Sequence, residues 1–384
     1  MSVYYIQMDI NLKEKAIFSK NLSPGNMYNT FDYIPGSVSW GTFATRFSKS
    51  DMQKFYDTFF QEKVIFTNLY PAIDSEVTAL PLPLSTFACK HKPGNPRNID
   101  IDGEKHNFYD YLLDISRLER RCPLCQSIKK NFVNGFYYKE KEGNTYYSYK
   151  VKKTVDMHNH IDDESQSTKK DNGLYSYEPL IKGQKFRGYI ILKGEWDNFK
   201  DVIKIIESMN NKEISIGKGR NNGYGLSIIN ILFDESYKLN DDKRLYMDDK
   251  LDLSNSSKFT LTLLSDLFIR DNYGNYYTYI DELLLSNILN NGHNNQFLPD
   301  NFELTRSFCR SKEVDGFNMK HKLPKNKMIG LQKGSSFCFK YFKLDSQLLS
   351  KRLLEIERNG IGLRKSEGYG MIAINLPYDM ENIG

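Results

Sequence analysis

Cys122 and Cys125 are separated by two residues, the spacing at which two thiolates hold one metal ion. Upstream, Cys89 and His91 are of the residue types that complete a tetrahedral zinc site, and His106 competes for the histidine position. Coordination by four protein ligands would make the zinc structural, and the alternative is a set of reduced cysteines without metal. The predicted zinc ligands are Cys89, His91, Cys122 and Cys125.

A cluster of histidines and carboxylates has the residue types for general acid–base cleavage of RNA. Its members are His158, His160, Asp162 and Asp163. The same stretch is polar and continues into Ser-Gln-Ser-Thr, a composition typical of a surface loop. We therefore predict no catalytic residue, with His158 and His160 as the alternative. Asp32 and the two aspartates of the cluster are carboxylates without an assigned role.

An internal repeat is the most informative pattern in the chain. The segment IGKGRNNGYGLSII at 216–229 aligns without a gap with IGLRKSEGYGMIAI at 361–374. Glycines permit positive φ and close backbone approach, so that several N–H groups can face one phosphate. Basic side chains add positive charge, and tyrosine rings can stack on bases. The alternative is a pair of purely structural turns.

The repeat predicts RNA contacts in both glycine loops. In the first they are Gly217, Lys218, Gly219, Arg220, Asn222, Gly223, Tyr224 and Gly225. In the second they are Gly362, Arg364, Lys365, Gly368, Tyr369 and Gly370. The first loop is the stronger candidate, because Glu367 dilutes the positive charge of the second.

The elements around the loops follow one order in both copies. Apolar residues recur at helical spacing in 199–209 and 348–356, just before the loops. Glycine-led, β-prone segments at 183–192 and 334–342 precede these helices. Each loop thus follows a helix and opens a strand, whereas a dinucleotide-binding loop follows a strand and opens a helix. This order excludes a nicotinamide-binding fingerprint.

Each copy needs a preceding strand and helix to complete a sheet. In the first copy, 3–18 alternates as a strand and 41–47 begins a helix, and in the second 258–270 is the strand candidate. Paired β-α-β halves form a ferredoxin-like sheet with helices on one face. The predicted fold class is therefore α+β, with two tandem ferredoxin-like (RRM-like) domains.

The domain boundaries follow from length and composition. The first domain is predicted at 1–240 and the second at 250–384, because 234–257 is polar and acidic. The first domain carries an insertion at about 85–175, which holds three cysteines and four histidines. With its zinc ligands, this insertion is predicted to be zinc-knuckle-like.

Lysines and aromatic rings alternate in 126–153. This composition suits a nucleic-acid surface or a contact with another subunit. It equally suits a hairpin with its rings inward and a turn at Gly143-Asn144. Elsewhere, Cys338 lies in a strand pattern and is predicted to be a small buried hydrophobe.

Composition limits the class of protein. The chain has 384 residues, 40% hydrophobic and 26% charged, as expected for a globular protein with two or more domains. Its net charge of +5 permits an anionic partner. No run reaches the roughly 18 apolar residues of a membrane span, and no secretory signal pattern is present. We expect a cytoplasmic protein without a membrane partner.

Four motifs resemble the RAMP superfamily, the repeat-associated RNA-binding subunits of CRISPR–Cas effector complexes. The first is Ile-Pro-Gly-Ser at 34–37 leading into Trp-Gly-Thr-Phe at 40–43, and the second is the segment 161–186. The other two are the glycine loops at 216–225 and 361–370. Many members have a basic residue where Trp40 stands in this chain.

The resemblance implies a non-catalytic, crRNA-binding subunit of a type III antiviral ribonucleoprotein. The chain most resembles the large type III-D subunit that caps the 5′ end of the guide. RNA contact at Gly36 and Ser37 is also implied. The implied partners are crRNA, other RAMP subunits, the large signature subunit and, indirectly, target RNA. The alternatives are a metal-independent endoribonuclease that processes pre-crRNA and a pure assembly scaffold.

Overall fold

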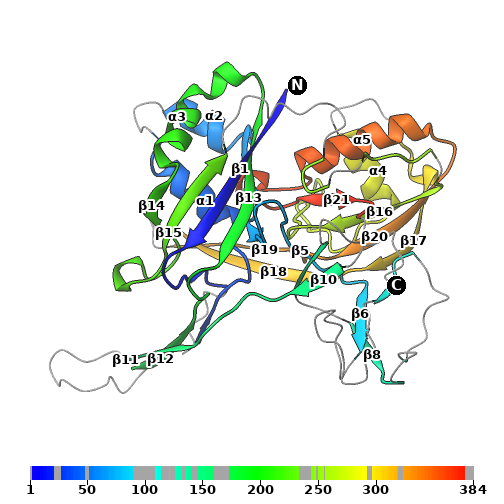
Figure 1. Cartoon of the computed structure of the whole chain (residues 1–384). Coiled ribbons are helices and arrows are strands. Elements are labelled where there is room, and N and C mark those ends of the chain that lie inside the picture. The colour runs from blue at the N-terminus through cyan, green and yellow to red at the C-terminus, as the bar shows by residue number, and fades with distance from the viewer. Residues whose placement is uncertain are drawn as a thin grey trace.

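A computed structural model gives a mixed α/β fold dominated by strands. It contains two modules, each a sheet covered by helices, that lie side by side (Figure 1). The described residues are 2–20, 27–47, 52–89, 109–113, 121, 126–131, 135–139, 146–159, 173–232, 244–247, 250–254, 256–291, 296–318 and 323–376.

The first module is built on a sheet with the order β14-β15-β1-β13-β3, and β4 also pairs with β13. All the neighbours are antiparallel. The strands are β1 (Val3–Leu12), β3 (Val64–Phe66), β4 (Tyr70–Pro71), β13 (Lys185–Lys193), β14 (Lys212–Ser215) and β15 (Leu226–Leu232). The helices are α1 (Gly36–Ala44), α2 (Met52–Phe59), α3 (Lys200–Met209) and a 3₁₀ turn at Trp196–Phe199.

Alternation along β1 explains why this sheet has two buried faces. Ile6, Met8 and Ile10 point into a core that includes residues of α1, α2 and α3. Tyr5 points to the opposite face, into a cluster that also contains Met371 of the second module. Both faces are therefore covered, by helices on one side and by the second module on the other.

The second module has a sheet with the order β17-β20-β16-β21. Its strands are β16 (Lys258–Leu263), β17 (Phe302–Phe308), β20 (Ser336–Tyr341) and β21 (Ile372–Ile374). Its helices are α4 (Glu282–Asn290), α5 (Ser346–Asn359) and a 3₁₀ turn at Pro299–Asn301. Strands β16, β17, β20 and β21 of this module correspond in chain order to β1, β3, β13 and β15 of the first. Both sets have the same order across the sheet, with the first strand between the third and the fourth. The repeat in the sequence therefore extends to the whole sheet.

Three predicted elements differ in length from the observed ones. Strand β1 ends at Leu12 and β16 at Leu263, although the apolar pattern continues in both cases. The extra apolar residues run beneath the glycine loops, where Ile17 pairs with Lys218. Helix α1 begins at Gly36, before the predicted start.

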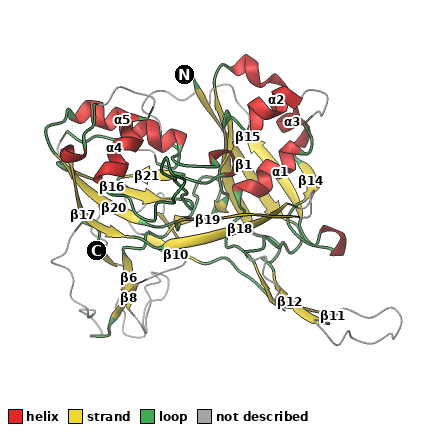
Figure 2. Cartoon of the chain, turned by 180° about the vertical axis from the view of Figure 1, so that it is seen from behind, coloured by secondary structure: helices red, strands yellow, loops and turns green. Residues whose placement is uncertain are grey.

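Four smaller sheets complete the fold (Figure 2). One is the pair β18 (Ser311–Asn318) and β19 (Leu323–Leu331), which in both views reaches from the second module across to the first. The others comprise β2 (Met27–Asn29), β11 (Asp156–Asn159) and β12 (Leu174–Glu178); β5 (Leu80–Pro81), β9 (Phe136–Lys139) and β10 (Tyr146–Tyr149); and β6 (Thr86–Cys89), β7 (Tyr109–Asp110) and β8 (Lys129–Asn131).

Strands β9 and β10 form the hairpin expected within 126–153. Their rings Phe136, Tyr137, Tyr138 and Tyr146 are all buried in the cluster that joins the two modules. A buried ring cannot stack on a base, so the structure favours the packed hairpin over a nucleic-acid surface at these four residues. Cys338 is buried in β20, as predicted.

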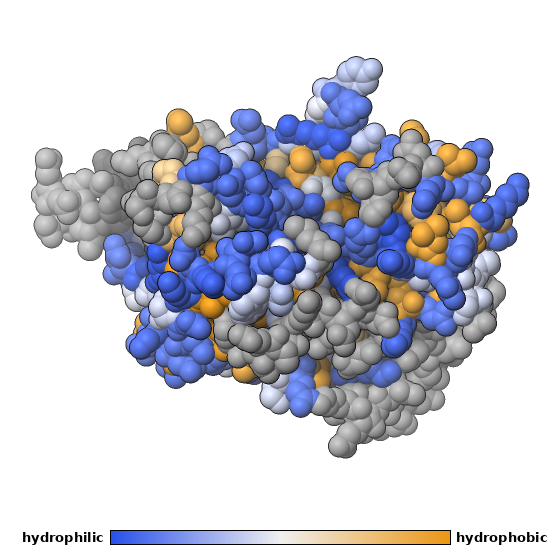
Figure 3. All heavy atoms as spheres, turned by 90° about the horizontal axis from the view of Figure 1, so that it is seen from above, coloured by the Kyte–Doolittle hydropathy of each residue, from blue (hydrophilic) through white to orange (hydrophobic). Residues whose placement is uncertain are grey.

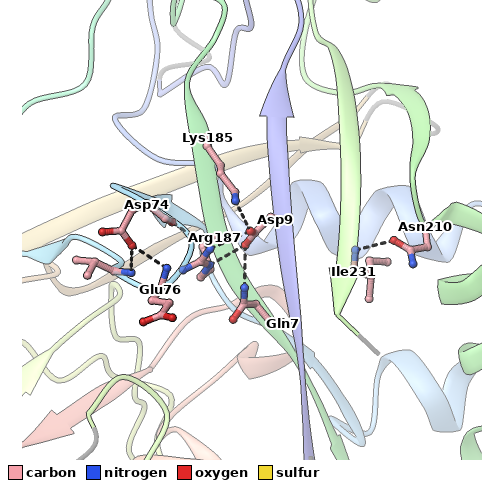
Figure 4. Close-up of polar contacts among 9 residues, drawn as sticks. Gln7, Asp9, Asp74, Glu76, Lys185, Arg187, Asn210 and Ile231 are labelled. Atoms are coloured by element: carbon pink, nitrogen blue, oxygen red, sulfur yellow. Dashed lines mark hydrogen bonds and ion pairs between the residues drawn. The ribbon is translucent and has the colours of Figure 1, made fainter. Parts of the chain in front are cut away.

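Two buried ion pairs hold the framework. In the first sheet, Arg187 donates to both carboxylate oxygens of Asp9 at 2.8 and 3.0 Å (Figure 4). At the module junction, Arg244 makes the same two-fold contact with Glu357 of α5 at 2.9 and 2.8 Å. Removing one partner of such a pair leaves a charge buried without compensation, which costs about 3–5 kcal/mol.

The outer surface is mostly hydrophilic where it is seen from above, with separate hydrophobic patches (Figure 3). Among the described helices, none combines the length and hydropathy of a membrane span.

Candidate nucleic-acid interface

The two glycine loops share one backbone framework. In the first loop, residues 216–225, the N–H of Ile216 donates to the carbonyl of Gly225 at 3.0 Å. In the second, residues 361–370, Ile361 donates to Gly370 at 2.9 Å. Each loop also bonds to the segment after the module's first strand. Lys218 donates to Ile17 at 2.9 Å, and Leu363 donates to Phe268 at 2.8 Å.

Left-handed backbone explains the glycine spacing. In the first loop φ is +85° at Gly217, +75° at Gly219, +80° at Gly223 and +85° at Gly225. The aligned values in the second loop are +80° at Gly362, +58° at Arg364, +88° at Gly368 and +71° at Gly370. A Cβ at Gly225 would lie 1.9 Å from the carbonyl oxygen of Ile216, so this close approach requires glycine.

The tip of the first loop is open to solvent. Residues 220–223, including the 3₁₀ turn Arg220–Asn222, are exposed, and a Cβ added at Gly223 would meet nothing within 4 Å. The Lys218 ammonium lies 3.4 Å from the centre of the Tyr28 ring, and burial lowers its pKa. Two cations, Lys218 and Arg220, are therefore presented on a backbone that another molecule can approach.

The second loop packs against the first module. A Cβ at Gly368 would lie 2.7 Å from the carbonyl oxygen of Phe66 in β3. Lys365 forms an ion pair of 2.9 Å with Glu62, and Arg364 forms one of 2.5 Å with Glu367. Both cations of this loop therefore already have partners, and its weaker role in RNA contact stays a prediction.

The first two residues of α1, Gly36 and Ser37, lie in different surroundings. Gly36 is buried, and a Cβ there would lie 2.1 Å from the Phe66 carbonyl oxygen and 2.7 Å from that of Glu367. Ser37, the next residue, lines the groove described below. The bare backbone at Gly36 thus serves the contact between the modules.

A groove of about 1660 Å³ runs between the modules and past both loops. The cations in its wall are Lys20, Arg46, Lys218, Arg220, Lys312, Lys333 and Arg364. The carboxylates are Asp32, Asp266, Glu313, Asp315 and Glu367, which leaves a formal excess of two positive charges. The aromatic rings are Phe18, Tyr28, Phe31, Tyr33, Trp40, Phe60 and Tyr369. Cations interleaved with rings are what a single nucleic-acid strand needs.

Two of the carboxylates that line the groove form ion pairs with lysines. Asp32 is ion-paired with Lys153 at 2.5 Å and with Lys20 at 3.6 Å. Burial opposes ionisation of Asp32, but the hydrogen bond from Lys153 and the charges of both lysines lower its pKa overall. Asp266 accepts from Lys312 at 2.5 Å. Both carboxylates thus have lysine partners and act as counterions for them.

His158 lies in β11 and not in a surface loop, which corrects that expectation. Its Nε2 is 2.9 Å from the hydroxyl of Tyr224, which in turn donates to Asp156 at 2.7 Å. Lys15 completes the chain through a 2.7 Å ion pair with Asp156. Burial opposes ionisation of Asp156, but the bonds from Lys15 and Tyr224 lower its pKa overall. This chain anchors Tyr224 at the base of the first loop.

Several predicted site residues fall outside the part of the chain that the structure describes. These are His91, His106, Cys122, Cys125, His160, Asp162 and Asp163. Cys89 ends β6. Within the described ranges no three potential metal-ligating side chains cluster together. The zinc site remains a prediction.

Sequence reasoning missed the contribution of the second module's β18–β20 region to the groove. Lys312 comes from β18 and Lys333 from the turn before β20. The available signal was the Lys333-Gly334 pair, because a glycine before a strand marks a tight turn, and φ at Gly334 is +84°. The sequence could not show that this turn faces the first module.

Comparison with known proteins finds no matching family model and no matching curated protein. Among solved structures, the chain matches one in the type III-B Cmr-beta complex bound to cognate target RNA and AMPPnP. The match covers 86% of each chain, with 14% identity and a TM-score of 0.42. A Cas6 product complex matches over 97% of this chain and 100% of that one, with 10% identity and a TM-score of 0.43. Thermus thermophilus Cas6 matches over 97% and 99%, with 10% identity and a TM-score of 0.38.

The structural neighbours are thus proteins of a Type III-B Cmr-beta complex and Cas6 proteins. At these TM-scores the likeness assigns neither an activity nor a partner. The groove and the loops of this chain carry the functional argument.

Proposed function

We propose that this chain is an RNA-binding subunit of a type III CRISPR–Cas ribonucleoprotein and that it holds the guide strand by its backbone. The supporting observation is the open first glycine loop at the edge of a groove lined by cations and aromatic rings. Phosphates would face Lys218, Arg220 and the exposed loop backbone, while bases would meet the rings.

The strand order supports the finer assignment of the fold. Within each β-α-β-β-α-β module, the first strand lies between the third and the fourth strand of the sheet. This strand order is ferredoxin-like. We propose two tandem RAMP units, at 1–240 with an insertion at about 85–175 and at 250–384. The proposed partners are crRNA, other RAMP subunits, the large signature subunit and, through the guide, target RNA.

An endoribonuclease acting through His158 is the less supported candidate. His158 is hydrogen-bonded to Tyr224 and does not line the groove. The test is incubation of the chain with repeat RNA, for the wild type and for His158→Ala. Cleavage by the wild type that the substitution abolishes would establish the enzyme, whereas uncut RNA would support the binding role.

The binding function is tested with a short single-stranded RNA of mixed sequence and fluorescence anisotropy. We expect affinity to fall steeply with salt and to vary little with sequence, because backbone contacts dominate. Absence of salt-dependent binding would overturn the proposal and leave an assembly scaffold as the alternative.

We also propose one structural zinc ion in the insertion, held by Cys89, His91, Cys122 and Cys125. Chelator-washed protein should retain about one zinc per chain, and the double variant Cys122→Ser, Cys125→Ser should lose it. Cys309→Ser is the matched control, because Cys309 is a free, exposed cysteine. Equal zinc content in the double variant and the wild type would contradict the site.

A further inference from the structure

Lys333 occupies a fixed turn at the seam between the modules. Its backbone N–H donates to Asp266 at 2.8 Å, and the next residue, Gly334, accepts from the N–H of Leu84 at 2.7 Å. A Cβ at Gly334 would lie 2.6 Å from the Leu82 carbonyl oxygen, so the turn is closely packed against the first module's chain. The position of the Lys333 side chain in the groove therefore depends on both modules.

The ammonium group of Lys333 is framed by aromatic rings. It lies 5.0 Å from the centre of the Tyr33 ring and 4.8 Å from that of Phe136. The side chain lines the groove and is only partly exposed. Rings contribute to holding a cation but do not neutralise it.

The carboxylates nearest Lys333 already have lysine partners. Asp32 pairs with Lys153 and Lys20, and Asp266 pairs with Lys312. Within the described ranges, the structure gives the Lys333 ammonium no hydrogen bond and no ion pair of its own, whereas each of these three lysines has one. The charge of Lys333 is thus available to a group that enters the groove.

Electrostatics agree with this geometry. Burial lowers the pKa of Lys333 to about 8, although Asp266 and Asp32 raise it, and Lys312 and Lys20 add to the lowering. An anion beside the ammonium would favour its charged form and raise this pKa again.

We propose that Lys333 binds one phosphate of the strand that occupies the groove, at a subsite that exists only where the two modules meet. This inference rests on the proposed RNA-binding function and extends it to the second module. The phosphate is either an internal diester or a terminal monoester, and the two sources present the same oxygens to the ammonium.

The test uses the full chain and a short single-stranded RNA made with a 5′-hydroxyl or a 5′-phosphate. The variants are Lys333→Met, which removes the charge, and Lys333→Arg, which keeps it. Lys340→Met is the matched control, because Lys340 also lies over a ring, that of Phe342 at 4.8 Å, but does not line the groove. Affinity is measured by anisotropy over a range of salt concentrations.

We expect Lys333→Met to reduce the slope of log K against log salt by about 0.7, the value for one single-strand phosphate. Lys333→Arg and Lys340→Met should keep the wild-type slope. If the loss occurs with both RNAs, the phosphate is internal. If it occurs only with the 5′-phosphorylated RNA, the phosphate is terminal.

A second readout does not depend on how well the methionine variant folds. Wild-type affinity should fall by up to about tenfold between about pH 7 and pH 9, because free Lys333 loses its proton in this range. Lys333→Arg should remove this fall, because arginine stays charged.

Unchanged salt slopes in Lys333→Met, or an equal pH dependence in the wild type and Lys333→Arg, would overturn the subsite and leave the RNA-binding proposal intact. Failure of the wild type to bind RNA would overturn the underlying function. The two failures are therefore distinguishable.

Discussion

The two glycine loops have nearly the same backbone and opposite surroundings. Gly223 and Gly368 occupy the same position with φ of +80° and +88°, yet the first faces open space and the second contacts β3. Lys218 and Arg220 of the first loop line the groove, whereas Lys365 of the second is paired with Glu62. The duplicated motif is thus open to solvent in one copy and packed against the other module in the second copy.

The largest expected effect concerns the polar groups that contact the strand after each loop. In β21, after the second loop, the N–H of Ile374 donates to Glu357 at 2.8 Å, and Glu357 is paired with Arg244. Arg244→Met should cost about 3–5 kcal/mol of unfolding free energy, because it leaves Glu357 buried without its cation. In β15, after the first loop, the N–H of Ile231 donates to the uncharged side chain of Asn210 at 2.8 Å (Figure 4). Asn210→Ala should cost only about 1 kcal/mol.

Urea unfolding measures both variants. As a control, Arg244→Met combined with Glu357→Leu should recover much of the loss, because no buried charge remains uncompensated. Equal costs for Arg244→Met and Asn210→Ala would contradict the larger stabilisation expected from the buried Arg244–Glu357 pair.

The next effect compares the aligned glycines directly. Gly223→Ala and Gly368→Ala carry the same left-handed strain, about 1 kcal/mol, so their difference reports packing. The Cβ at Gly368 would lie 2.7 Å from the Phe66 oxygen, so we expect Gly368→Ala to cost roughly 2 kcal/mol more. Thermal and urea unfolding measure the stability of the two variants. Similar stabilities would mean that the loops do not differ in packing.

Removal of the loop cations should affect RNA binding more in the first loop than in the second. Lys218→Ala with Arg220→Ala should flatten the salt dependence of RNA binding by about 1.4, for two lost single-strand phosphate contacts. The fold should survive, because exposed charges contribute little stability. Arg364→Ala with Lys365→Ala should change the salt slope less, since both cations are ion-paired. An unchanged salt slope in the variant Lys218→Ala, Arg220→Ala would mean that the first loop is only a structural turn.

A further expected effect is a pH dependence of stability near the second loop. Burial first, and then the charge of Lys365, lower the pKa of Lys193 to about 7. A lysine with a folded-state pKa below its unfolded value binds fewer protons when folded, so stability rises with pH above about 7. The slope from this group is at most about 1.4 kcal/mol per pH unit.

Lys193→Met should flatten that rise in urea unfolding at a series of pH values above 7. The Lys193 ammonium also donates to the carbonyl of Asn359 at 3.0 Å, so the variant loses one hydrogen bond at the end of α5. A pH dependence identical to that of the wild type would show that Lys193 is not desolvated at this junction.

Much of the architecture was predictable because it depends on local patterns. The repeat at 216–229 and 361–374, the helices before it and the strands after it follow from glycine spacing and apolar periodicity. The predicted ends of β1 and β16 lie several residues beyond the observed ends at Leu12 and Leu263. The apolar residues beyond Leu12 and Leu263 pack beneath the loops, and periodicity alone does not separate such a segment from a continuing strand.

The sequence by itself determined the duplication, the order of elements and most of the backbone of both loops, since left-handed positions favour glycine wherever the chain lies. Glycine fills all four such positions in the first loop and three of four in the second, where Arg364 takes the fourth. Only the tertiary structure decided which loop stays open. Gly368 of the second loop packs against Phe66 of the first module, and Lys312 and Lys333 of the second module line the same groove as Lys218. These contacts join residues far apart in the chain, and local patterns of glycine and apolar residues do not encode them.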